Sequence, residues 1–189
     1  YSELIRQENK RMNEQVENVL RLAMLDRKEL EMNFTPFDLH ELLSGVVERF
    51  RLKSDSRNAE IALDLAASRS FVKADHAHLE SVIQNLLDNA LKYSDGEPKI
   101  LIQTANLKDE LLVKVSDQGL GMNAETVRHV FDRFYRAPTG NVHNIKGHGL
   151  GLAYVREVLS MHGAEIKVQS SLGKGSTFYF NLFVHHEES

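Results

Sequence analysis

The stretch Asn85-Leu-Leu-Asp-Asn89-Ala-Leu-Lys92-Tyr93 combines helix-forming leucines with two carboxamides, a lysine and an aromatic ring. At about 100° per residue, these four polar or aromatic side chains fall on one face of a helix. Asp75 is a suitable N-cap upstream, so the pattern predicts a helix from about residue 76 to residue 93. The four side chains can therefore meet one ligand.

Helical and alternating patterns follow one another on both sides of this helix. Apolar spacing predicts further helices at about 39–50, 124–130 and 150–162, with Gly163 as the left-handed stop of the last one. Strands are predicted at 60–65, 70–73, 98–105, 110–117, 166–169 and 176–184. This order predicts an α+β fold, a two-layer α/β sandwich in which one mixed, mostly antiparallel sheet carries helices on one face.

Residues 1–32 carry a thin apolar seam at helical spacing within a charged stretch that has no proline or glycine. A long helix of this kind cannot bury its seam on itself, so we expect it to pack on a partner helix or another chain. A helix folded back on its own domain is the alternative. Phe34-Thr-Pro-Phe37 breaks the pattern and predicts a short extended segment. The predicted domains are therefore 1–33 and 34–189.

Composition excludes several classes of partner. The formal net charge of −4, with acids and bases interspersed, gives no basic field, so neither nucleic acid nor anionic lipid is expected as a main ligand. The absence of cysteine from all 189 residues excludes disulfides and cysteine metal sites and fits a reducing compartment. No stretch approaches the roughly 18 apolar residues of a membrane span, so we expect a soluble piece without membrane contact.

The polar face of the 76–93 helix suits a metal-bound polyphosphate. Carboxamide oxygens such as those of Asn85 and Asn89 suit Mg²⁺, which takes further ligands from phosphates. Lys92 offers a point charge for phosphate, and Tyr93 can pack beside a base or ribose. Two alternatives stay open: the asparagines can cap or bridge neighbouring backbone instead, and Asp88 near the same face is another candidate metal ligand.

A second segment, Asp117-Gln-Gly119-Leu-Gly121, follows a predicted strand. Asp117 shares parity with Val113 and Val115, so its carboxylate leaves the strand on the core face and needs a partner. An adenine amine is such a donor, and the two glycines let backbone approach the ring closely. The competing interpretation is a plain Asp-x-Gly turn.

A third segment, Gly147-His-Gly149-Leu150-Gly151-Leu152, precedes a predicted amphipathic helix. The N-terminus of a helix presents free amides and the positive end of its dipole, which suits phosphate. The segment is not a Walker motif, because no Gly-Lys-Ser/Thr follows, and no βαβ context supports a dinucleotide fold. Alone it is a weak signal, but the three segments together indicate a site for a magnesium-bound nucleotide.

In order and spacing these segments resemble the ATP-binding domain of bacterial sensor histidine kinases, of the Bergerat (GHKL) type. The resemblance covers roughly residues 34–184. Five motifs of that family match in order: the N box (85–93), the first glycine box (117–121), the F box (Phe131 to Arg136), the second glycine box (147–152) and the last glycine motif (173–177). Five matches in this order are highly specific.

The resemblance implies roles for particular residues. Asn89, with Asn85 assisting, would hold Mg²⁺, Lys92 and Arg136 would meet the phosphates of ATP, and Asp117 would bind the adenine amine. Residues 136–147 would form a mobile lid over ATP. The implied nucleotide-binding residues are Asn85, Asn89, Lys92, Tyr93, Asp117, Gly119, Gly121, Arg136, Gly147, Gly149, Leu150, Gly151 and Thr177.

The amino-terminal helix is similar to the second helix of the family's dimerisation and histidine-phosphotransfer hairpin. The resemblance therefore implies a cytoplasmic kinase fragment of a membrane-anchored sensor, homodimeric through this helix in the full-length protein. It would transfer the γ-phosphoryl of ATP to a histidine outside this chain, and then to an aspartate of a response regulator receiver domain. His40-Glu41 is not the acceptor pair: it begins a helix with Leu39, Leu42 and Leu43 on the buried side, so we expect His40 to face solvent.

Two other functions are considered. A GHKL-type ATPase that couples hydrolysis to movement is disfavoured, because such relatives carry a glutamate in the N box as the base that activates water, and this chain has Asn85 there. A catalytically silent dimerising scaffold with a degenerate site is disfavoured because every motif is intact.

Overall fold

The computed structural model describes residue 12 and residues 31–54, 58–94, 96–136 and 149–185. The long helix predicted for residues 1–32 falls almost entirely outside the described residues. The same holds for Gly147 and for all of the predicted lid after Arg136. The boundary between residues 33 and 34 therefore stays a prediction.

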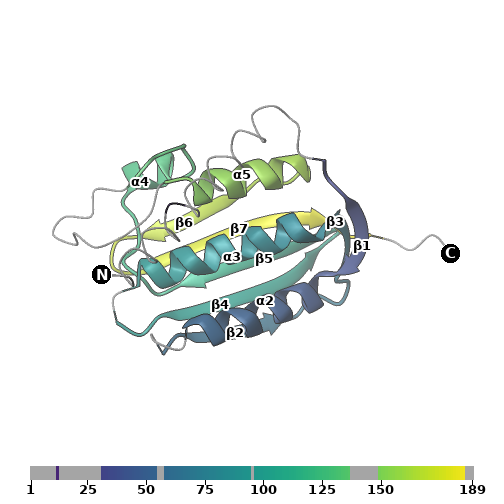
Figure 1. Ribbon diagram of the computed structural model, residues 1–189, viewed down its shortest axis with the longest axis horizontal. Coiled ribbons are helices and arrows are strands. Elements are labelled where there is room, and N and C mark those ends of the chain that lie inside the picture. The colour runs from purple at the N-terminus through teal and green to yellow at the C-terminus, as the bar shows by residue number, and fades with distance from the viewer. Residues whose placement is uncertain (1–11, 13–30, 55–57, 95, 137–148, 186–189) are drawn as a thin grey trace.

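A five-stranded sheet forms one layer of the molecule (Figure 1). Its strand order is β2-β4-β5-β7-β6, in which β2 is parallel to β4 and every other neighbouring pair is antiparallel. The bounds are Glu60–Leu65 for β2, Lys99–Leu107 for β4, Glu110–Asp117 for β5, Lys167–Ser171 for β6 and Gly175–Phe183 for β7. The predicted mixed, mostly antiparallel sheet is confirmed, and its strands begin and end within two residues of the predicted ranges.

Helices α2 (Leu39–Ser54), α3 (His76–Lys92) and α5 (Gly151–Met161) lie over one face of this sheet (Figure 1). The short helix α4 (Ala124–His129) contacts the edge strand β6. The two-layer sandwich with helices on one face is therefore confirmed. Among the described residues, no helix combines the length and the apolar composition that crossing a membrane requires.

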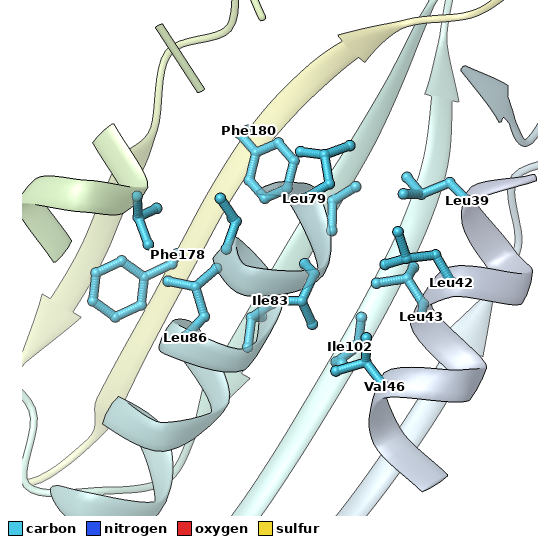
Figure 2. Packing of buried hydrophobic residues seen from close by; sticks show 14 of the residues in the cluster. Leu39, Leu42, Leu43, Val46, Leu79, Ile83, Leu86, Ile102, Phe178 and Phe180 are labelled. Carbon is cyan, nitrogen blue, oxygen red and sulfur yellow. The ribbon is translucent and has the colours of Figure 1, made fainter. Parts of the chain in front are cut away.

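The core lies between the three helices and the covered face of the sheet. Because side chains alternate along a strand, the inward residues of the central strands are almost fully buried: Ile102 and Val113 are 0% exposed and Phe180 is 2% exposed. Figure 2 shows Leu79 and Ile83 of α3 within this layer. With this apolar face of α3 buried, Asn85 and Asn89 lie at its margin, where both are partly buried.

The start of α3 and the end of α5 have the capping residues that the sequence predicts. The Asp75 carboxylate caps α3 by accepting a hydrogen bond from the His78 N–H at 2.9 Å. Gly163, just after α5, has a φ of +70° and occupies the left-handed conformation predicted for it. Tyr93 is the C-cap of α3 rather than a residue of the helix.

The prediction of a single sheet is wrong for the strand near residue 70. β1 (Phe34–Asp38) and β3 (Phe71–Asp75) form a separate two-stranded antiparallel sheet. The extended segment predicted at 34–37 is thus a paired strand. Pro36 lacks the N–H that a central strand would need, so its strand suits an edge position. One isolated bridge, between Val72 and Val184, links β3 to the residue after β7.

The expectation that His40 faces solvent is also wrong. Its ring Nε2 lies 2.9 Å from the hydroxyl of Thr104, a buried residue of β4. The His40 backbone N–H donates to the Asp38 carboxylate at 2.8 Å. His40 therefore fixes the first turn of α2 to the sheet, and the helical pattern of leucines did not indicate this because the contact is between polar groups.

Candidate functional site

The carboxamides of α3 face the beginning of α5. Asn85 Nδ2 donates to the Ser81 carbonyl at 2.8 Å, so the backbone-bridging interpretation is correct for this end of the side chain. Asn85 Oδ1 lies against Gly151, where a Cβ atom would come within 2.7 Å of that oxygen. Asn89, one turn later, is partly buried, and its carboxamide makes no hydrogen bond to another described residue.

Cationic and aromatic groups gather where α3 ends. The Lys92 Nζ atom lies 4.9 Å from the centroid of the Tyr93 ring. Burial lowers the pKa of Lys92, and the positive charge of Arg136 lowers this pKa further. Burial raises the pKa of Tyr93, and Arg136 acts in the opposite direction. Arg136 is thus close enough to influence both groups, and an anion beside Lys92 and Arg136 would relieve their repulsion.

Asp117 lies at the end of β5 and is partly buried. Its Oδ1 atom accepts hydrogen bonds from the Gly119 N–H at 2.8 Å and the Ser176 N–H at 3.3 Å. Burial raises the pKa of this carboxyl group, while the two hydrogen bonds lower it. Within the part of the chain that the structure describes, Oδ2 accepts no hydrogen bond, so it is available to a further donor. The Asp-x-Gly turn thus engages Oδ1 of Asp117, and Oδ2 has no hydrogen bond to a described residue.

Gly119 and Gly121 allow the Asp117 turn to approach neighbouring backbone closely. A Cβ atom on Gly119 would lie 2.5 Å from the Tyr93 carbonyl oxygen, which also accepts the Leu120 N–H at 2.9 Å. Gly121 has a φ of +64°, and a Cβ atom there would overlap the Ser171 carbonyl. These contacts place Asp117 beside the end of α3. They also show that both glycines are needed for protein contacts, whether or not a ligand ring approaches.

The F box (Phe131 to Arg136) is hydrogen-bonded to the residues just before α5. The Phe134 N–H donates to the Gly149 carbonyl at 2.9 Å, and a Cβ atom on Gly149 would lie 2.6 Å from the Tyr135 carbonyl oxygen. Phe131 packs edge to face on Phe178, with ring centroids 6.2 Å apart. These contacts hold the segment that leads to Arg136 close to the start of α5.

The N-terminus of α5 has no side-chain cap among the described residues. Leu150, its N-cap, is 4% exposed, so its side chain belongs to the core and only its backbone is available to a ligand. The first amide groups of a helix lack partners inside the helix, and here no hydroxyl or carboxylate of the described residues satisfies them from the cap position. This arrangement suits an anion.

The structure places the Thr177 side chain away from Asp117. In the β5–β7 register Thr177 pairs with Ser116, whereas Ser176 pairs with Asp117. The Thr177 and Ser116 hydroxyls lie 2.9 Å apart on the sheet face opposite to that of Asp117. Ser176 therefore occupies the position beside the carboxylate, and sequence reasoning missed it. The signal was available, because Ser176 shares parity with Phe178, a core residue.

The described site residues thus come together where α3 ends, β5 ends and α5 begins. Asp88, the alternative metal ligand, is exposed on α3. Among the described residues, no group of three or more histidine, aspartate or glutamate side chains could hold a metal ion.

Residues 74–186 match the family described as histidine kinase-, DNA gyrase B-, and HSP90-like ATPase. The match covers more than half of the chain and contains every described segment of the site. The chain belongs to this family.

Curated relatives extend the likeness to nearly the whole chain. Over 183 residues, or 96% of this chain, it is 39% identical to the sensor protein RprX of Bacteroides fragilis. Over the same share it is 32% identical to the sensor histidine kinase WalK of Bacillus subtilis. The chain spans about a third of the length of these relatives, 35% and 30% respectively.

Solved structures share the fold. Full-length ShkA in complex with AMPPNP matches with a TM-score of 0.82 at 24% identity, over 96% of this chain and 38% of that chain. The catalytic domain of the histidine kinase ThkA matches with a TM-score of 0.71 at 27% identity, over 81% of this chain and 97% of that chain. ThkA in complex with the response regulator protein TrrA matches with a TM-score of 0.72 at 23% identity, over 94% of this chain and 50% of that chain.

Proposed function

We propose that this chain contains the ATP-binding kinase domain of a two-component sensor histidine kinase. It binds ATP with Mg²⁺ and, within a longer cytoplasmic portion, transfers the γ-phosphoryl group to a histidine outside this chain. The observation that carries the proposal is the junction at the end of α3. There the Tyr93 carbonyl accepts the Leu120 N–H, which brings the Asp117 turn beside the helix end that carries Lys92.

In this proposal the base of ATP meets Asp117. Oδ2 is an acceptor in a partly buried place, and the exocyclic amine of adenine is a donor. Charge-assisted hydrogen bonds of this kind are stronger than neutral ones, particularly away from water. Tyr93, whose ring is also partly buried, lines the same junction and packs beside the base or ribose.

The phosphates lie toward the beginning of α5. Lys92 and Arg136 offset their negative charge, and the backbone of Gly149, Leu150 and Gly151 offers the helix N-terminus. Gly147 belongs to the same proposed segment and lies outside the described residues.

The donor set fits magnesium. The carboxamide of Asn89 is not engaged by any described residue, and an amide oxygen is a hard ligand of the kind that Mg²⁺ takes together with phosphate oxygens. Asn85 assists, with its Oδ1 atom held against Gly151. When bound, the ion neutralises charge on the phosphates and holds them in position.

Phosphoryl transfer to histidine is favoured over hydrolysis by the chemistry of the N box. A water-activating base must accept a proton, and the amide of Asn85 does not do so near neutral pH. The transferred phosphoryl group then passes to a response regulator receiver domain. The fold shared with ThkA in its complex with a response regulator supports this partner, and homodimerisation through residues 1–33 belongs to the same proposal.

Calorimetric titration of the chain with AMPPNP, with and without Mg²⁺, tests the binding step. We expect binding that strengthens with Mg²⁺ and loses that dependence in Asn89→Ala. The transfer step is tested with a chain extended upstream, incubated with γ-labelled ATP. Acid-labile label on histidine supports the kinase. Release of inorganic phosphate without labelled protein would support the ATPase instead, and absence of nucleotide binding would support the silent scaffold.

A further inference from the structure

Ser170, on β6, lies at the centre of three backbone segments near Asp117. Its hydroxyl accepts the Met122 N–H at 2.8 Å, lies 2.8 Å from the Gly175 carbonyl oxygen and lies 3.0 Å from the Ser176 hydroxyl. These contacts join β6, the loop that follows the Asp117 turn and the start of β7. Neither the family match nor the motifs assign a role to Ser170.

The hydrogen-bond partners fix the direction of each bond. A hydroxyl group has one hydrogen and two acceptor positions. A carbonyl oxygen can only accept, so the Ser170 hydrogen is directed to Gly175, and the Met122 N–H fills one acceptor position of Ser170. The remaining contact requires the Ser176 hydroxyl to donate to Ser170. Ser176 then has no hydrogen left for a ligand and presents only acceptor positions.

Ser176 shares the face of Asp117. The two residues are partners in the β5–β7 register, and the Ser176 N–H donates to Asp117 Oδ1. Ser176 is 9% exposed, so its hydroxyl lies within the protein rather than in open solvent. Asp117 and Ser176 are thus neighbours on one sheet face, and the positions left open on Oδ2 and on this hydroxyl are all acceptors. A ligand group that meets both of them must be a donor.

We propose that Ser170 is a positioning residue for base selection: it holds the Ser176 hydroxyl as an acceptor, so that the site prefers an amino group over an oxo group at position 6 of a purine. The proposal rests on the proposed nucleotide function. An oxo group at this position is an acceptor, so it would face the acceptor positions of Asp117 and Ser176. The Asp117 carboxylate would then have no donor from the ligand. Buried polar sites discriminate most strongly against a ligand that leaves their polar groups unpaired.

A purely structural role for Ser170 predicts a different result. Loss of its hydroxyl would then loosen the strands and weaken every nucleotide by the same factor. In the positioning role, loss of the hydroxyl frees the Ser176 hydrogen to donate, so an oxo group is tolerated better while an amino group binds less well. The ratio of the two affinities therefore distinguishes the roles, and overall affinity does not.

The test measures dissociation constants of ADP and inosine diphosphate by calorimetry, with Mg²⁺ present, for the parent chain and three variants. Ser170→Ala is expected to reduce the preference for ADP by about tenfold, the effect of one well-placed hydrogen bond. Ser170→Thr keeps a hydroxyl and should restore the preference. Ser171→Ala changes the neighbouring exposed serine of the same strand and should leave the preference unchanged. Thermal unfolding of each variant reports whether it folds.

Ser176→Ala and the double variant Ser170→Ala/Ser176→Ala complete the test. If Ser170→Ala does not fold, Ser176→Ala alone tests whether the Ser176 hydroxyl affects selectivity. If Ser170 acts through Ser176, then Ser170→Ala adds no further loss of selectivity in the Ser176→Ala background. Equal weakening of both nucleotides by Ser170→Ala, or unchanged selectivity in Ser176→Ala, would overturn the proposal and leave the nucleotide function intact. A parent chain that binds neither nucleotide would instead overturn the proposed function, and this inference with it.

Discussion

Single residues of the site differ in which of their atoms the protein already engages. Asp117 divides its oxygens, with Oδ1 held by two backbone N–H groups and Oδ2 left to a ligand. Asn85 engages Nδ2 in the same way, while Asn89 keeps its carboxamide free of the other described residues. In the proposed function, Asp117 and Asn85 are thus oriented before the ligand arrives, which reduces the conformational entropy lost on binding.

Asp117→Asn is expected to weaken the binding of adenine nucleotides by more than about 1 kcal/mol, because a carboxylate that accepts a hydrogen bond away from water is replaced by a neutral amide. Titration of AMPPNP with Mg²⁺ measures the change. Asp109→Asn, at the exposed turn between β4 and β5, is the matched control and should leave affinity unchanged. A smaller loss in Asp117→Asn would show that the carboxylate does not bind the base.

Parity along a strand and position within a motif select different residues of β7. Parity predicted that Asp117 lies on the core face of β5, and Asp117 is partly buried and pairs with the buried Ser176. The choice of Thr177 came from the last glycine motif alone, and the same parity rule applied to β7 would have selected Ser176. The division of Asp117 oxygens could not be predicted, because it depends on the backbone geometry of a turn that the sequence does not specify.

Among the elements, α3 is held by other segments at both of its ends. At its start, Asp75 accepts the Asn33 N–H at 2.8 Å through Oδ2, and the Asp75 N–H donates to His162 Nε2 at 3.0 Å. At its end, the Tyr93 carbonyl accepts the Leu120 N–H. The helix is therefore fixed at both ends, by the segment leading into β1 and α5 at one end and by the Asp117 turn at the other.

Gly121→Ala should destabilise the protein more than Gly173→Ala. Both glycines have positive φ, +64° and +74°, so each substitution costs about 1 kcal/mol of backbone strain. A Cβ atom on Gly121 would also overlap the Ser171 carbonyl, whereas no atom of the described residues lies within 4 Å of a Cβ atom on Gly173. Urea unfolding measures both variants, and Gly121→Ala should also weaken nucleotide binding. Equal losses of stability would show that the Gly121 loop can shift without cost.

The contact between α3 and α5 predicts a dependence of stability on pH. Burial lowers the pKa of His162 from its ordinary value of 6.5, and its Nε2 atom must stay unprotonated to accept the Asp75 N–H. Between the lowered pKa and 6.5 the unfolded chain binds more protons than the folded one, so the free energy of unfolding rises with pH in this window and levels off above it. Urea unfolding at several pH values should show this rise, and His162→Gln should reduce it. An identical slope in the variant would exclude His162 as its source.

Local periodicity predicted the elements well, because burial on one face imposes a period of two on strands and 3.6 on helices. It did not predict which strands pair. β3 has the same alternation as the strands of the main sheet, and its pairing with β1 is a contact between residues 34–38 and 71–75 that no local pattern encodes. The contact of His40 with Thr104 was missed for the same reason.

For the whole molecule, the site lies at one end of the sandwich, and two of the described histidines make their hydrogen bonds away from it. His40 is bound to β4 and His162 to the start of α3. Transfer of a phosphoryl group requires the acceptor nitrogen in line with the leaving oxygen at near-attack distance. In the proposed function, the acceptor histidine approaches from outside the described residues.

This chain is accordingly expected to bind ATP without phosphorylating itself. It should label a separately supplied acceptor hairpin only weakly, because the hairpin's register with residues 1–32 is lost. Incubation with γ-labelled ATP, followed by an assay for acid-labile phosphohistidine, measures both. Binding of AMPPNP by the same preparation is the control for folding. Acid-labile label on His40 would contradict the domain boundary and place the acceptor inside this chain.

The order of strands in the sheet has a consequence for synthesis on the ribosome. β7 lies between β5 and β6, yet its residues 175–183 are made after those of every other strand of the sheet. Until they emerge, β5 presents an unpaired edge with Leu111, Val113 and Val115 along it, and β6 has no neighbour in the sheet. If the ribosome stalls before Gly175, the nascent chain therefore exposes an unpaired strand edge that can pair with other chains. Chaperones should bind this nascent chain most strongly just before β7 emerges.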